Sequence, residues 1–190
     1  MKVNTFLSAV ATSALIFGLA HGPLLAAEPH VHGTGTLQLV LEGGSFNAEL
    51  RLPAINVVGF EHAPREKKHQ EAVKKAAALL QDPRQVLALP EEARCVAAPA
   101  EVTSELLETG EHNHGDPKQE AEHDHAQGEP HADFEAAYRF DCSRPEALKK
   151  IQVLVLKKLS HLETLEVDIA TPAGQGRQRL TPRQATVTLP

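Results

Sequence analysis

The chain has 190 residues, of which 42% are hydrophobic and 23% are charged, with 25 Asp and Glu against 19 Lys and Arg. This length suits one domain with a real hydrophobic core. The formal net charge of −6 argues against nucleic acid as a partner, because phosphate backbones attract basic surfaces.

Residues 1–27 have the pattern of a secretory signal peptide. Lys2 gives a short basic start, an apolar run covers residues 6–20, and Leu25-Ala26-Ala27 supplies small residues for cleavage. The apolar run is shorter than the roughly 20 residues of a membrane-spanning helix. We therefore expect export to the periplasm and no membrane insertion after cleavage. Because Lys2 is removed, the mature chain from Glu28 onward carries a net charge of −7.

The mature chain opens with two segments, 36–41 and 46–52, in which every second side chain is apolar. A Glu42-Gly43-Gly44-Ser45 turn separates them, so they predict a β-hairpin that Pro53 ends. The same alternation, in places weaker, predicts further strands. These are expected at 94–106 with a break near Pro99, at 134–140, at 165–169, and in a final pair that follows Gly174 and ends at Leu189.

One helix stands out. Pro64 is expected to open it, because a missing N–H costs nothing at the first helical position, and Asp82-Pro83 stops it. Its apolar face consists of Val73, Ala76, Ala77 and Leu80. His69 lies off this face and is expected to be a solvated surface residue.

The remaining segments are less regular. Residues 55–60 are expected to cross the core as an apolar connection. Ser143 and Glu146 have the spacing of a capping box, which predicts a short helix to Lys150. Residues 151–159 fit a strand or a helix. The sum predicts a single α+β domain over residues 28–190, with two layers, one main helix and an antiparallel sheet of about six to seven strands.

The stretch from Glu111 to His131 contains five histidines interleaved with six carboxylates. It has almost no apolar side chains, so it cannot bury enough surface to offset the entropy of ordering. We expect a disordered loop over residues 109–130 that binds several metal ions weakly. Its candidate ligands are His112, His114, His123, Asp124 and His125. The alternative is a solvated acidic linker with incidental histidines.

Cys95 and Cys142 are the two cysteines of the chain. In an exported protein such a pair indicates a disulfide, here one that brackets the His-rich loop and is expected to tie its two ends to the same part of the fold. A cysteine-ligated zinc is the alternative, although the chain has no Cys-x-x-Cys motif.

Further histidines and carboxylates form three groups outside the loop, and we expect the tight metal site to be built from them. The candidates are His30, His32, Glu61, His62, His131 and Asp133. In an extended segment, residues two apart point the same way, so the first and last pairs can each meet one ion. Alternatively, Glu61 and His62 cap the following helix and the N-terminal pair is frayed. His161 is expected to have no specific role.

These groups also carry a resemblance. The chain resembles the ZrgA-type family of exported zinc-uptake accessory proteins over nearly the whole mature length. The similar blocks are His30-x-His32-Gly33, Pro53-Ala54-x-Asn56-x-Val58-Gly59-Phe60-Glu61-His62, Ala93-x-Cys95, His131-x-Asp133-Phe134 with Tyr138 and Cys142, and Gly174-Gln175. The resemblance implies a periplasmic location, zinc binding and work alongside a high-affinity zinc importer. The chain departs from the family in residues 154–162, which lack aromatic side chains.

The first hypothesis is therefore a periplasmic Zn²⁺-binding protein, not an enzyme, that buffers zinc or delivers it to components of a zinc importer. A nickel or copper resistance sponge is a second hypothesis; the mature chain has no Met, which disfavours Cu⁺ capture but leaves Ni²⁺ open. The importer's own solute-binding protein is a third, disfavoured by the short chain. A zinc-dependent hydrolase is a fourth, without a supporting sequence motif.

Overall fold

The computed structural model describes residues 32–108 and 132–190. The expected signal peptide at 1–27 and the expected loop at 109–130 lie outside these residues, as do His30 and His131. Within the described ranges, no helix is long and apolar enough to cross a membrane.

The expected N-terminal hairpin is confirmed. β1 (Thr34–Glu42) and β2 (Ser45–Pro53) are antiparallel, with Leu41 opposite Phe46. Alternate side chains along both strands are buried, and Leu39 and Phe46 are 1% and 0% exposed. The period-two pattern therefore predicted both the strands and the face that each side chain takes.

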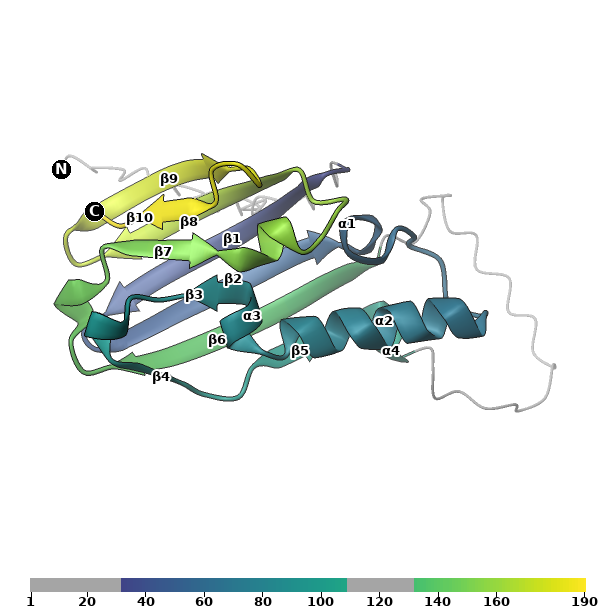
Figure 1. The fold of residues 1–190 in the computed structure, drawn as a ribbon, viewed down its shortest axis with the longest axis horizontal. Helices are drawn as coiled ribbons and strands as arrows, with labels where there is room; N and C mark the ends of the chain where they lie inside the picture. The colour runs from purple at the N-terminus through teal and green to yellow at the C-terminus, as the bar shows by residue number, and fades with distance from the viewer. Residues whose placement is uncertain (1–31, 109–131) are drawn as a thin grey trace, which may run out of the picture.

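The hairpin lies in the middle of a seven-stranded sheet (Figure 1). β2 pairs with β6 (Asp133–Cys142), which also pairs with two short strands, β4 (Cys95–Ala97) and β5 (Glu101–Thr103). On the other side, β1 pairs with β8 (Thr164–Thr171), and β8 pairs with β9 (Gly174–Leu180). The segment expected as a weak strand near Pro99 thus forms two strands.

The expectation of an antiparallel sheet is wrong at one pair, because β1 and β8 are parallel. β6 reaches β1 through two antiparallel pairings, so β6 and β8 run in the same direction. A chain that leaves one strand and returns in the same direction must cross back over the sheet. Residues 143–163 make this crossover.

The crossover, the segment after β2 and the C-terminal segment after β9 form a second layer over one face of the sheet (Figure 1). The layer contains α2 (Lys67–Leu80), α3 (Pro83–Val86) and a small sheet of β3 (Leu87–Ala88), β7 (Lys150–Val153) and β10 (Thr186–Thr188). Three 3₁₀ helices complete it, η1 (Glu91–Ala93), η2 (Pro145–Ala147) and η3 (Leu154–Lys157).

The apolar face of α2 is confirmed, since Val73, Ala76, Ala77 and Leu80 are buried. The Tyr138 O–H on β6 donates a hydrogen bond of 2.9 Å to the Leu80 carbonyl at the end of this helix. Burial raises the pKa of the Tyr138 phenol, so the group remains a donor. This bond joins the end of α2 to the sheet.

Several local expectations are wrong. Residues 55–60, expected as an apolar connection that crosses the core, mostly belong to a short helix, α1 (Ala54–Val58), which follows the end of β2. Pro64 does not open α2; it is buried in the preceding loop, and the helix begins at Lys67. Glu146 makes no capping box, because η2 has Arg144 as its N-cap and no side-chain capping bond.

The expected disulfide between Cys95 and Cys142 is present, with an S–S distance of 2.05 Å. It joins β4 to the last residue of β6. The His-rich segment instead attaches near the first residue of β6, after α4 (Glu105–Glu108) and before Ala132. A ten-residue strand is about 30 Å long, so the disulfide does not hold the ends of that segment, contrary to expectation.

Candidate metal centre

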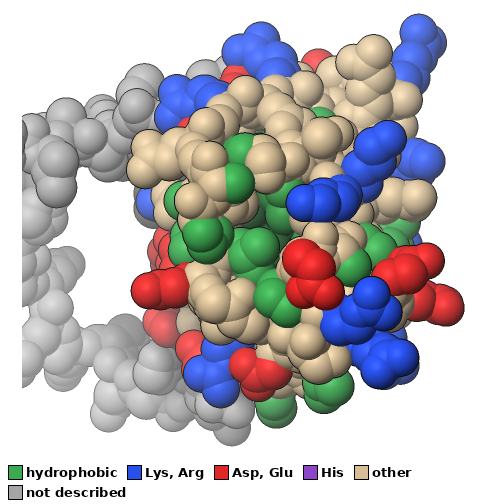
Figure 2. Space-filling view, turned by 90° about the vertical axis from the view of Figure 1, so that its left-hand side faces the viewer, with side chains coloured by type: hydrophobic (Ala, Val, Ile, Leu, Met, Phe, Trp, Pro, Cys, Tyr) green, Lys and Arg blue, Asp and Glu red, His purple; other side chains and the backbone are tan. Residues whose placement is uncertain are grey.

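The four histidines of the described residues lie at one end of the molecule, which we call the α1 end. His32 precedes β1, His62 follows α1, His69 is in the first turn of α2, and His161 precedes β8. These segments meet because the parallel strands β1 and β8 start at the same end of the sheet, and β2 finishes at that end. In Figure 1 this end carries the α1 label, and Figure 2 views the opposite end, where no described histidine is visible.

The buried Asn56 on α1 holds this end together. Its side chain is 1% exposed, and its Oδ1 accepts a 2.7 Å hydrogen bond from the Gly33 N–H. Its Nδ2 donates to the Thr34 carbonyl at 2.9 Å. The Gly33 carbonyl accepts the N–H groups of Glu163 and Thr164 at 2.8 and 2.9 Å. The Asn56 amide thus fixes the start of β1 to α1, and the Gly33 carbonyl fixes it to the start of β8.

Replacing Asn56 with Ala is expected to lower the free energy of unfolding by roughly 2–4 kcal/mol, because it leaves a backbone N–H and a carbonyl without their partner. Urea denaturation measures the change. Asn47→Ala is the matched control, since Asn47 makes only a 3.4 Å bond to Ser45, and it is expected to cost less than about 1 kcal/mol. Equal losses in the two variants would contradict the clamp role of Asn56.

Gly59 turns the chain after α1. It has φ of +84° in the left-handed region, and its N–H donates to the Ile55 carbonyl at 3.1 Å, which ends the helix. A Cβ at Gly59 would lie 3.5 Å from the Nε2 atom of His161, so the backbone passes close to that ring. The turn sends the next residues back toward α2.

Phe60, His62 and His69 form a cluster of three rings. The centroid of the Phe60 ring lies 5.0 Å from that of the His62 ring, and the two ring planes are nearly parallel at 22°. The Phe60 and His69 ring centroids are 4.4 Å apart. The two imidazole centroids are 5.1 Å apart at 60°. His69 lies off the buried face of α2, as expected, but it is half-buried and contacts two rings rather than being fully solvated. His62 lies outside the helix and folds back onto it, so helical spacing could not predict this contact.

The tautomer of His62 follows from its hydrogen bond. Its Nδ1 lies 3.1 Å from the Ala63 carbonyl oxygen, which can only accept. In the neutral imidazole, Nδ1 then carries the proton, and Nε2 has a lone pair that is able to bind a metal. This is the arrangement of most metal-ligating histidines, in which the second nitrogen donates to a carbonyl or carboxylate.

Asp133 has a different environment. Its side chain is 6% exposed, and its Oδ2 lies 2.7 Å from both Nε and Nη2 of Arg51. The hydrogen bond with Asp133 is the main cause that raises the pKa of the Arg51 guanidinium. Glu105 accepts the Asp133 backbone N–H at 3.1 Å. Part of the negative charge of Asp133 is thus compensated, which weakens it as a candidate ligand.

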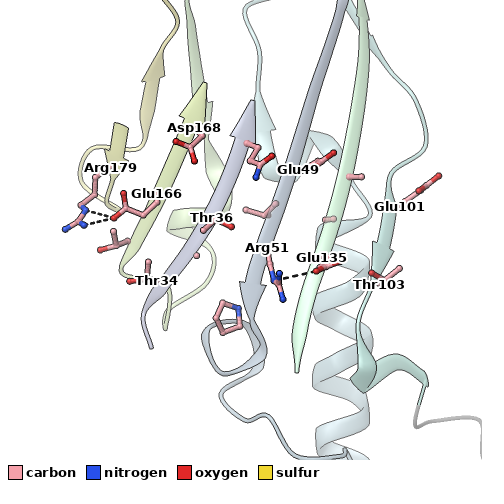
Figure 3. Close-up of a pocket in the computed structure, with 17 residues that line it drawn as sticks. Thr34, Thr36, Glu49, Arg51, Glu101, Thr103, Glu135, Glu166, Asp168 and Arg179 are labelled. Carbon is pink, nitrogen blue, oxygen red and sulfur yellow. Dashed lines mark hydrogen bonds and ion pairs between the residues drawn. The ribbon is translucent and has the colours of Figure 1, made fainter. Parts of the chain in front are cut away.

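The outer face of the sheet presents more carboxylates, in a shallow groove across β5, β6, β2, β1, β8 and β9 (Figure 3). Several of them face arginines. Arg51 lies 3.5 Å from Glu135, Arg179 pairs with Glu166, and Arg177 pairs with Asp168, whose pKa its hydrogen bond lowers. These pairings make the groove a poor cation site.

The remaining sequence-predicted ligands are placed as follows. His32 is exposed, and Glu61 is half-buried beside His62. His30, His131 and the loop candidates lie outside the described residues. Within the described ranges, no group of three or more His, Cys, Asp or Glu side chains could hold a metal ion. The six-residue site therefore stays a prediction. The contacts of His69 and of Arg51 were missed, because both depend on which segments the fold brings together.

Comparison with known proteins gives one result that covers the chain. A family model described as ZrgA family zinc uptake protein matches residues 29–189. No curated protein matches.

Proposed function

Since the chain belongs to the ZrgA family of zinc uptake proteins, we propose that it is an exported periplasmic protein that captures Zn²⁺. It then buffers the ion or delivers it to a high-affinity zinc importer, and it acts by binding rather than by catalysis. The observation that carries this proposal is the gathering of all four described histidines at the α1 end.

The chain path supports a division of labour between the His-rich segment and the folded body. The segment leaves after Glu108 and returns at Ala132, whose carbonyl accepts the N–H of Ala54, the first residue of α1. Glu105, four residues before the segment, accepts a hydrogen bond from the Asp133 backbone N–H on the other side of it. Both attachment points thus lie at the α1 end, the end that carries the described histidines.

We place the tighter binding on the body and the weaker binding in the segment. Rigid elements hold ligands in geometry, whereas a polar tract must be ordered before it can bind, and this ordering subtracts from affinity. The body candidates remain His30, His32, Glu61, His62, His131 and Asp133. Among the described candidates, Asp133 is the weakest, because Arg51 already pairs with its carboxylate.

Titration of the mature chain, residues 28–190, against a zinc-binding competitor dye tests the proposal. We expect more than one Zn²⁺ per chain, in one tighter and several weaker events, because the sequence offers two sets of imidazoles. Parallel titrations with Ni²⁺ and Cu²⁺ compare the resistance-sponge hypothesis. Absence of zinc binding by the folded chain would contradict the proposal.

A transfer experiment separates buffering from delivery. The zinc-loaded chain is mixed with the periplasmic binding protein of a zinc importer, and the transfer rate is followed at rising acceptor concentration. A rate that rises with the acceptor indicates direct delivery, because the acceptor then takes part in the limiting step. A rate that stays at the dissociation rate of the chain indicates buffering.

A further inference from the structure

Two of the imidazoles at the α1 end come from separate elements and lie within reach of one ion. His69 is in the first turn of α2, where its backbone N–H donates to the Glu66 carbonyl at 2.9 Å. His62 is in the loop between α1 and α2 and is exposed. Their ring centroids are 5.1 Å apart, at an angle of 60°.

This separation fits two ligands on one zinc ion. Imidazole nitrogens lie about 2.0–2.1 Å from a tetrahedral Zn²⁺, which puts the centres of two ligating rings about 5 Å apart. The measured centroid distance agrees with this value. His62 Nδ1 is already used by the Ala63 carbonyl, so its free nitrogen is Nε2, the one available to an ion.

Phe60 fixes the pair. Its ring stacks on His62 with a centroid distance of 5.0 Å and packs on His69 with a centroid distance of 4.4 Å. It therefore supports both imidazoles, although it has no ligating atom itself. Such support limits the rotamers of both rings before an ion arrives, and this reduces the entropy lost on binding.

The charges beside the pair do not oppose a cation. The lysines of the first turn of α2 face carboxylates, with Lys68 Nζ 2.9 Å from Glu66 and Lys67 Nζ 3.9 Å from Glu71. Their positive charge is therefore partly compensated near His69.

We propose that His62 and His69 bind the same Zn²⁺ ion, with Phe60 as a positioning residue. This inference rests on the proposed function, in which zinc is the cargo. Two protein ligands leave the other coordination positions to water or to a donor from an incoming acceptor. These open positions allow the ion to exchange, which suits an ion that must be handed on.

Imidazole NMR of the ¹⁵N-labelled mature chain tests the shared ion. During zinc addition, the ring nitrogens of His62 and His69 are expected to shift together along one titration curve. His62→Ala should abolish the zinc-dependent shift of His69, and His69→Ala should abolish that of His62. His161→Ala is the matched control, because the His161 ring lies near the same loop, with Nε2 3.5 Å from where a Cβ of Gly59 would be, and its loss should leave both shifts intact. His69→Gln replaces His69→Ala if the latter unfolds.

The positioning role of Phe60 has its own readout. Phe60→Leu is expected to weaken zinc binding at the pair about tenfold, as for other residues that support metal ligands, whereas Phe60→Tyr keeps the ring and should preserve binding. Equal affinities of the Leu and Tyr variants would overturn this role.

The outcomes separate the two proposals. If the mature chain binds zinc while the His62 and His69 rings do not shift, or shift along different curves, the shared site is overturned and zinc capture stands. If the folded chain binds no zinc at all, the proposed function falls together with the site. A shift of both rings that each single substitution abolishes supports both.

Discussion

A double variant, Cys95→Ala and Cys142→Ala, is expected to lose roughly 4 kcal/mol of unfolding free energy. The disulfide closes a sequence separation of 47 residues, and the entropy of the unfolded chain rises by about this amount when the cross-link is removed. Once the bond is removed, strand pairing holds β4 only weakly in place, because β4 pairs with β6 over only three residues. Guanidinium denaturation of the oxidised wild type and the variant measures the difference.

Two controls define this result. The wild type under reducing conditions should lose nearly as much as the double variant, because both lack the cross-link. Zinc binding by the folded variant should be unchanged, since the disulfide and the α1 end lie at opposite ends of β6. A loss below about 1 kcal/mol would mean that the unfolded chain gains little freedom when the bond is removed.

Replacing residues 109–130 with a short Gly-Ser linker is expected to lower the number of zinc ions bound per chain and to leave the fold intact. The segment lies between α4 and β6 and joins points that Glu105 and Asp133 already bring together. Shortening such a connection changes stability by less than about 1 kcal/mol, because closure entropy depends only weakly on loop length. Calorimetry with zinc and urea denaturation measure the two quantities.

A full-length variant in which the four loop histidines, His112, His114, His123 and His125, become Asn is the matched control. It keeps the length but removes the imidazoles, so it should lose the same weak events. One tighter event should survive in both proteins and vanish when His62→Ala and His131→Ala are added. An unchanged ion count after the replacement, or an unfolded domain, would contradict the assignment of weak binding to this segment.

The sequence predicted the strands well where one face of the sheet is buried. In β1, β2 and β6 the alternation between buried and exposed side chains appeared directly as a period of two. The apolar face of α2 was equally clear, with its four buried residues at helical spacing. The Cys pair and the family also followed from the sequence, because a chain with two cysteines allows one internal pairing and the similar blocks recur from His30 to Gln175.

The helix boundaries were less predictable. Pro64 has the local properties of a helix start, but the structure buries it before α2 begins, so tertiary packing overrode a local preference. Ser143 and Glu146 have capping-box spacing, but the short 3₁₀ turn η2 that they flank uses no side-chain cap. Local rules state what a segment tolerates, and the contacts around it decide which option is used.

The sequence by itself determined the sheet-rich class, the buried faces, the disulfide partners and the family. Only the tertiary structure decided that β8 runs parallel to β1, that Asn56 fastens α1 to the start of β1, and that His62 folds back onto His69. The physical reason is range. Alternation, capping and composition act over a few neighbouring residues, whereas strand direction and the meeting of two imidazoles depend on where a crossover or a loop returns the chain.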